Sequence, residues 1–78
     1  MNKVQVLQAV ADRIDLELFY TICVGRSFEA RLQGDLTPQA ITSLSGLECD
    51  WKAHANGWMQ CDVDLGEVSV HITLMTNG

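Results

Sequence analysis

Five acidic residues lie close together in the second half of the chain, between residues 48 and 67. They are Glu48, Asp50, Asp62, Asp64 and Glu67. If this stretch forms antiparallel strands, all five side chains fall on one face of a sheet. Carboxylates that face each other across strands repel, so a fold that keeps them together indicates an external use for them. No glycine-rich phosphate loop or metalloprotease motif accompanies them.

Paired carboxylates can act as the acid and base of a glycosidase, or they can bind Ca²⁺ or Mg²⁺. Catalysis needs a concave and partly dry pocket, which a flat sheet face on an 8.6 kDa chain does not offer. No loop has the spacing of an EF-hand. We therefore expect no catalytic residues, no metal and no cofactor.

The histidines and cysteines do not complete a site either. His54 and His71 share the acidic face without a facing thiolate, which leaves an incomplete set of zinc ligands. The three cysteines, an odd number without CxxC spacing, are typical of reduced thiols in a cytosolic protein. Cys49 and Cys61 are expected to point into the core as small apolar side chains.

Composition predicts one domain over residues 1–78. Apolar residues make up 47% of the chain and there is a single proline, which argues against disorder. No apolar run is long enough for a membrane span and no signal peptide is visible, so a cytoplasmic location is expected. Of the net charge of −5, residues 46–78 carry −4. This sign excludes direct binding of nucleic acid and suits a basic partner or solubility.

The first element predicted is a helix over residues 3–14. Asn2 and Gln5 have the spacing of a capping box at its start. The apolar residues that recur on one face, and are expected to be buried, are Val4, Leu7, Val10, Ala11 and Ile14.

Two strands follow, over residues 16–24 and 28–36. A three-residue loop, Gly25–Ser27, pairs Val24 with Phe28 and keeps the apolar residues on one face. It also leaves Phe19 and Cys23 on the polar face. Either a covering terminus or a bulge explains them, or they form a contact with another chain, such as a symmetric dimer.

A second, short helix is predicted over residues 38–45. Thr37 is its N-cap and Pro38 its first residue. Ile41 and Leu44 are expected to be buried, and Gly46 to end the helix.

The remaining residues predict a three-stranded meander. A loop at residues 55–57 places Trp51 opposite Cys61, and a turn around residues 65–66 places Val63 opposite Val68. The expected core face comprises Cys49, Trp51, Ala53, Met59, Cys61, Val63, Val68, Val70, Ile72 and Leu74. On the other face Asp50 opposes Asp62, Glu48 opposes Asp64, and Lys52, Gln60 and His71 form one row. His54, Trp58 and Thr73 form the next.

The resulting order, α-β-β-α-β-β-β, predicts an α+β fold in which two helices pack on one face of an antiparallel sheet of about five strands. The function it favours is a small acidic, non-enzymatic protein-binding module, of the inhibitor or adaptor type, that docks its acidic sheet face on a basic partner surface. Phage-encoded inhibitors, anti-CRISPR proteins among them, share this size and charge, which is an analogy of properties and not of sequence.

The residues expected to bind the partner are the five acids, Glu48, Asp50, Asp62, Asp64 and Glu67, together with Trp58, because aromatic side chains anchor interfaces. The alternative is a subunit of a homo-oligomer, such as a homodimer, that uses Phe19, Cys23 or an exposed strand edge. A metal-binding or carboxylate enzyme is a distant third hypothesis.

Overall fold

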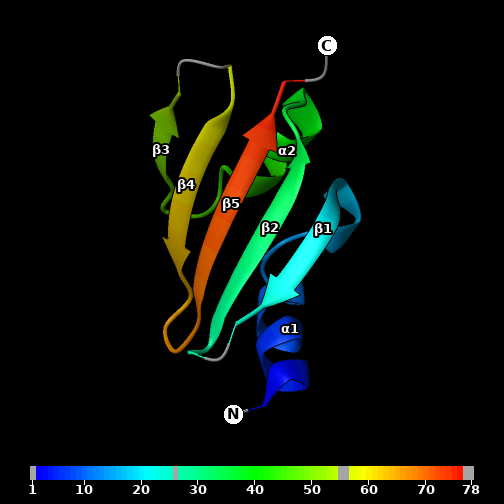
Figure 1. The fold of residues 1–78 in the computed structure, drawn as a ribbon, viewed down its shortest axis with the longest axis vertical. Helices are drawn as coiled ribbons and strands as arrows, with labels where there is room; N and C mark the ends of the chain where they lie inside the picture. Colours follow the sequence, from blue (N-terminus) through cyan, green and yellow to red (C-terminus); the bar gives the residue numbers. More distant parts are fainter. Residues whose placement is uncertain (1, 26, 55–56, 77–78) are drawn as a thin grey trace.

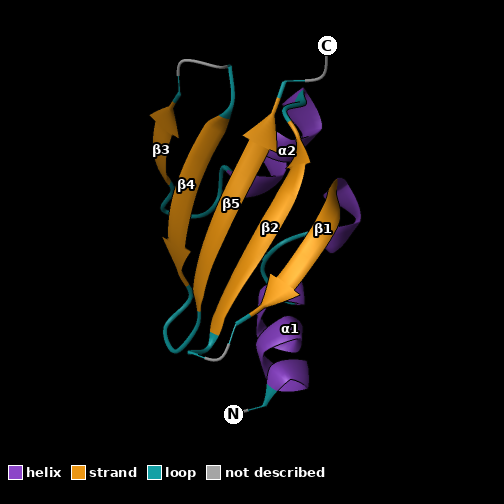
Figure 2. Cartoon of the chain, in the orientation of Figure 1, coloured by secondary structure: helices purple, strands orange, loops and turns teal. Residues whose placement is uncertain are grey.

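A computed structural model describes residues 2–25, 27–54 and 57–76. Five strands form one sheet, and both helices lie behind it in the view of Figure 1, so the sheet has a covered face and an uncovered face. Figure 2 shows the same two layers by secondary structure. The elements are α1 (Lys3–Ala11), η1 (Leu16–Leu18), β1 (Phe19–Val24), β2 (Glu29–Asp35), α2 (Pro38–Leu44), β3 (Asp50–Ala53), β4 (Met59–Asp64) and β5 (Ser69–Met75).

The predicted α+β class and element order are confirmed, but the sheet is mixed and not purely antiparallel. Its strand order is β1-β2-β5-β4-β3, and β2 runs parallel to β5. The last strand therefore lies in the middle of the sheet, between β2 and β4. Alternation along a strand predicts which side chains are buried, but it does not predict which strands become neighbours.

The start of α1 is confirmed, whereas its buried face is not the predicted one. The side chain of Asn2 accepts a hydrogen bond from the backbone of Gln5, and the Gln5 side chain accepts one from the backbone of Asn2. The helix ends at Ala11, earlier than predicted. It buries Val6 and Val10, and Ile14 is buried just beyond its end. The rest of the predicted face is exposed or half-buried: Val4, Leu7 and Ala11.

Residues 16–18 form a 3-10 turn, so β1 begins only at Phe19. A bulge between Phe19 and Thr21 turns the start of the strand. Phe19 consequently points into the core, where 8% of it is exposed. The predicted position of Phe19 on the polar face is therefore wrong, and the bulge is the alternative that the structure supports. Cys23 remains exposed on the uncovered face.

The hairpin between β1 and β2 is shifted by two residues from the prediction. Val24 pairs with Ala30 instead of Phe28, and Ile22 pairs with Leu32. Phe28 takes a positive φ of 55° in the connection, which removes it from the strand. Arg26, in the middle of the predicted loop, lies outside the described residues. A shift by two leaves every side chain on the same face.

The second helix begins as predicted. The Thr37 hydroxyl oxygen accepts a hydrogen bond from the Ala40 backbone, and Pro38 is the first helical residue. The helix buries Ala40 and Leu44. Ile41, predicted to lie in the core, is instead exposed.

The register of β3 against β4 is confirmed in full, from Asp50 opposite Asp62 to Ala53 opposite Met59. Gly57 has the predicted positive φ, 81°, while the other two residues of that loop, 55 and 56, lie outside the described residues. The next turn is wrong by two residues, because Val63 pairs with Val70 and not with Val68.

The core lies between the sheet and the helices. It consists of Val6, Val10, Ile14, Phe19, Ala30, Leu32, Ala40, Leu44, Cys61, Val63, Val68, Val70, Ile72 and Leu74. Of the predicted core face, three residues are only half-buried, Cys49, Trp51 and Met59, and Ala53 is exposed at the sheet edge. Among the helices described, none is both long and apolar enough to cross a membrane.

Gly34 generates a test of the bulged start of β1. A Cβ at this position would lie 2.8 Å from the Leu18 carbonyl oxygen and 3.0 Å from a ring carbon of Phe19. Gly34→Ala should therefore lower the free energy of unfolding by about 1–3 kcal/mol through overpacking, as measured by urea denaturation.

Gly46 provides the matched control, because a Cβ there meets nothing within 4 Å. Gly46→Ala should change the free energy of unfolding by no more than about 0.5 kcal/mol. Equal losses at the two glycines would contradict the close contact of Gly34 with residues 18 and 19.

Candidate functional site

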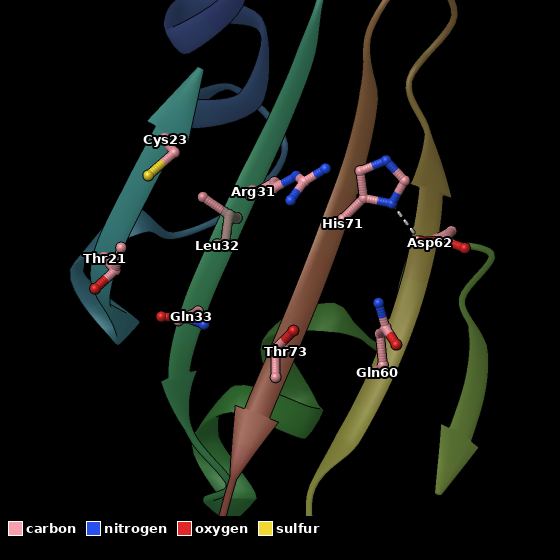
Figure 3. Close-up of a pocket in the computed structure, with 9 residues that line it drawn as sticks. All are labelled: Thr21, Cys23, Arg31, Leu32, Gln33, Gln60, Asp62, His71 and Thr73. Atoms are coloured by element: carbon pink, nitrogen blue, oxygen red, sulfur yellow. Dashed lines mark hydrogen bonds and ion pairs between the residues drawn. The ribbon is translucent and has the colours of Figure 1, made fainter. Parts of the chain in front are cut away.

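The uncovered face of the sheet is hollowed into a partly open basin of about 520 Å³. Its lining comes from strands β1, β2, β5 and β4, and Figure 3 shows the side chains, of which all but the buried Leu32 lie at outward positions. The lining residues are Thr21, Cys23, Arg31, Leu32, Gln33, Gln60, Asp62, His71 and Thr73. Most of these residues have polar side chains, and one of them, Asp62, belongs to the predicted acidic cluster.

One continuous row of paired residues crosses the face. Asp50 lies opposite Asp62, Asp62 opposite His71, His71 opposite Arg31, and Arg31 opposite Cys23. The row therefore runs from two carboxylates on β3 and β4 to a guanidinium on β2. The prediction had placed His71 opposite Gln60. The two-residue shift in the β4–β5 turn moves the imidazole to the second carboxylate.

His71 joins the two sides of this row. Its Nδ1 atom lies 2.5 Å from an Asp62 carboxylate oxygen, and its Nε2 atom lies 3.6 Å from a carboxylate oxygen of Glu29 on β2. The dashed line in Figure 3 marks the first of these contacts. The ring is held between two acids, and this fixes the orientation of the Asp62 side chain toward the middle of the sheet.

The next row is uncharged except at one end. Lys52 pairs with Gln60, Gln60 with Thr73, Thr73 with Gln33, and Gln33 with Thr21. These amides and hydroxyls can each donate and accept hydrogen bonds. They form the floor of the basin next to the charged row.

A row with aromatic and sulfur-containing side chains lies at the end of the face where β5 ends. The rings of His54 and Trp58 are stacked, with centroids 3.7 Å apart. Extending the β4–β5 register by one residue places Trp58 opposite Met75. The Tyr20 hydroxyl lies 3.6 Å from the Met75 sulfur. Tyr20, turned outward by the bulge in β1, is 60% exposed and Met75 is 42% exposed.

The structure brings together only part of the predicted acidic cluster. Asp50 and Asp62 face each other as expected. Asp64 lies opposite Ser69. Its carboxylate accepts a hydrogen bond of 2.9 Å from the Gly66 backbone, so this side chain stabilises the β4–β5 turn in addition to adding charge to the face. Glu48 and Glu67 are exposed in the segments that flank β3 and β5 and do not pair within the sheet.

Four contributors to the face were missed by sequence reasoning: His71 as the partner of Asp62, Glu29, Tyr20 and Met75. The sequence does contain a signal for the first. Asp64 and Gly66 have the spacing at which an aspartate side chain bonds the backbone two residues later. That turn lengthens the loop after Asp64 and thereby sets the register that brings His71 to Asp62. The bulge that exposes Tyr20 leaves no comparable signal.

A nucleophilic site built from Cys23, His71 and Asp62 does not fit this geometry. Cys23 is on β1 and His71 on β5, with β2 between them. Two strand spacings amount to about 9.5 Å, far beyond the roughly 3 Å at which a base can take a proton. Figure 3 shows Arg31 in the intervening position.

The other thiols belong to the core side. Burial raises the pKa of the Cys61 thiol, and the neighbouring Cys49 raises it further. Cys61 therefore stays protonated and is a small apolar group of the core. Nor do three or more histidine, cysteine or acidic side chains converge as a metal-holding group anywhere in the described ranges.

The chain was compared with models of protein families, with curated proteins and with solved structures, and none of the three comparisons found a match. Function is therefore inferred from the chemistry of the uncovered face and not from the fold.

The opposed carboxylates generate a test of stability. Asp50→Asn should raise the free energy of unfolding by about 0.2–1 kcal/mol, because it removes the repulsion across β3 and β4. Asp62→Asn removes the same repulsion but also weakens the hydrogen bond to His71. Its stabilisation should therefore be smaller than that of Asp50→Asn. Urea denaturation at low salt measures both, and a larger gain for Asp62→Asn would contradict the role of His71.

Proposed function

We propose that the chain is a small protein-binding module, of the inhibitor or adaptor type, that docks the uncovered face of its sheet on a basic surface of another protein. The observation that carries the proposal is the coexistence, on this one uncovered face, of clustered carboxylates and a row with two aromatic side chains, the exposed Tyr20 and the half-buried Trp58. The first attracts a basic partner and the second can anchor it.

The charge of the face favours a basic partner. Side-chain alternation directs five acids and two bases of the strands away from the helices. The acids are Glu29, Asp35, Asp50, Asp62 and Asp64, and the bases are Arg31 and Lys52. Glu48 and Glu67 add negative charge beside it. Such a surface speeds the encounter with a positively charged partner and disfavours negatively charged ones, nucleic acid among them.

The row of Trp58, Met75 and Tyr20 supplies apolar contact area, which can hold a partner after the charges have attracted it. Tryptophan and tyrosine dominate the binding energy of many interfaces. The stacking on His54 holds the Trp58 ring in place, so little side-chain freedom remains to be lost on binding. The molecule measures 37 by 21 Å across the view of Figure 1, a size that suits a standard interface of about 800 Å² per partner.

The face is less suited to catalysis. Its basin is partly open to solvent and most of the residues that line it are polar, whereas small-molecule sites are mostly apolar and enclosed. In the described part of the chain, the side chains that pair with His71 are the carboxylates of Asp62 and Glu29, and Cys23 lies two strands away.

The test uses two variants with the same change of charge. Asp50→Asn with Asp62→Asn alters the uncovered face, and Asp12→Asn with Glu17→Gln alters exposed acids near α1 and η1 on the helix side. A partner is first captured from a cell lysate with the wild-type chain and identified, and its association rate is then measured by surface plasmon resonance.

The first variant should slow association by about tenfold or more and change dissociation less, because these charges act mainly on the encounter. The helix-side variant should keep the wild-type rate. Association should also slow as the Debye length falls from about 10 Å at 0.1 M salt to about 3 Å at 1 M. A partner that responds equally to both variants, or not to salt, would contradict the proposal.

A further inference from the structure

The first helix carries apolar side chains that the described part of the chain covers only in part or leaves exposed. Val6 and Val10 pack into the core, but Val4, Leu7 and Ala11 lie along another side of α1. These three line an open groove of about 600 Å³, together with Gln8 of the helix and Leu16, Ile22 and Val24. Val4 is 69% exposed and Ile22 is 40% exposed. The groove runs between α1 and β1, and it contains no charged residue.

The strand beside this groove is an open edge. β1 is the first strand of the sheet, with β2 on one side and, within the described residues, no strand on the other. The Gly25 backbone N–H donates to the Glu29 carbonyl oxygen. By the alternation of an antiparallel pair, the N–H and C=O groups of Ile22 and Val24 therefore point outward from the edge. The residues that line the groove are thus the ones that offer free backbone groups.

Edge strands are usually protected against pairing by charges, prolines or short length. The other edge, β3, follows this rule, since it has four residues that include Asp50 and Lys52. β1 has six residues, Phe19–Val24, without a charge or a proline. Its bulge is confined to the start of the strand. The two edges of the sheet therefore differ in a way that leaves β1 open to another strand.

Charge is distributed so that a second copy of the chain can approach this edge. Residues 1–45 hold five acids and four bases, a net charge of −1, whereas residues 46–78 hold −4. The acids of the second segment are on β3, β4 and the loops beside them. β4 is three strand spacings from β1, roughly 14 Å, which already exceeds the Debye length of about 8 Å at physiological ionic strength. Two copies joined at β1 therefore keep their acidic ends far apart.

From these observations we infer that β1 and the groove beside it form a homodimer interface. Two copies pair β1 with β1 in antiparallel orientation about a twofold axis, and each α1 groove is closed by side chains of the other copy. The pairing is self-complementary, as a twofold interface requires. The interface uses the edge of β1 and the groove beside α1, whereas the proposed binding function uses the uncovered face, so the inference goes beyond that function. The two uncovered faces would form one continuous surface with an acidic region at each end.

The experiment is sedimentation equilibrium over low to high micromolar concentrations. The wild-type chain should reach twice its mass of 8.6 kDa. Ile22→Lys places a charge at the paired edge and Val4→Lys places one in the groove. Each should raise the dimer dissociation constant by at least about tenfold, because a charge is costly to bury without a partner. Ala53→Lys, on the opposite edge strand, is the matched control and should leave the constant unchanged.

Hydrogen exchange separates this interface from other modes of assembly. The amides of Ile22 and Val24 should become protected as the dimer forms, while that of Cys23, which faces β2, is protected in both states. If Ile22→Lys perturbs folding, Val4→Lys still tests the interface, because Val4 is largely exposed and a lysine there should leave the fold of the monomer intact. A wild-type chain that stays monomeric at high micromolar concentration overturns the inference. So does a dimer that survives both lysine variants, or protection of Ile22 and Val24 only after another protein is added.

Discussion

The parallel pairing of β2 with β5 holds the middle of the sheet, and the other strands are placed relative to it. Its inward residues are completely buried: Ala30, Leu32, Val70, Ile72 and Leu74. Because β5 occupies the centre, β4 and β3 extend the sheet on one side and β1 on the other. The acidic strands and the uncharged edge strand are thereby separated by the width of the sheet.

The sequence correctly predicts those features that depend on interactions between residues close together in the chain. The caps at Asn2 and Thr37, the β3–β4 register and the outward direction of Asp50 and Asp62 all follow from residues close in the sequence. The errors arise where the backbone departs from regular alternation. The bulge in β1 reverses Phe19 and Tyr20, and strand neighbours such as β2 and β5 are selected by packing over long distances.

The sequence predicts where the acids of the candidate site lie, but it does not predict which side chains they contact. Alternation was sufficient to place the carboxylates on one face, whereas the position of His71 depends on the length of a single turn. A shift of two residues leaves the buried face unchanged, so burial does not distinguish the two registers. It does change which polar groups meet, and here it converts an isolated imidazole into the partner of both Asp62 and Glu29.

The central parallel pair also constrains the order in which the molecule can fold. Every paired position, from Glu29 with Ser69 to Asp35 with Met75, joins residues 40 apart in the chain. The first hairpin and α1 can associate early, but their apolar surface stays uncovered until β5 has been synthesised and inserted between β2 and β4. Contacts of such long sequence separation slow folding and prolong the exposure of unpaired strands. Completion of the sheet must therefore wait for the last strand to leave the ribosome.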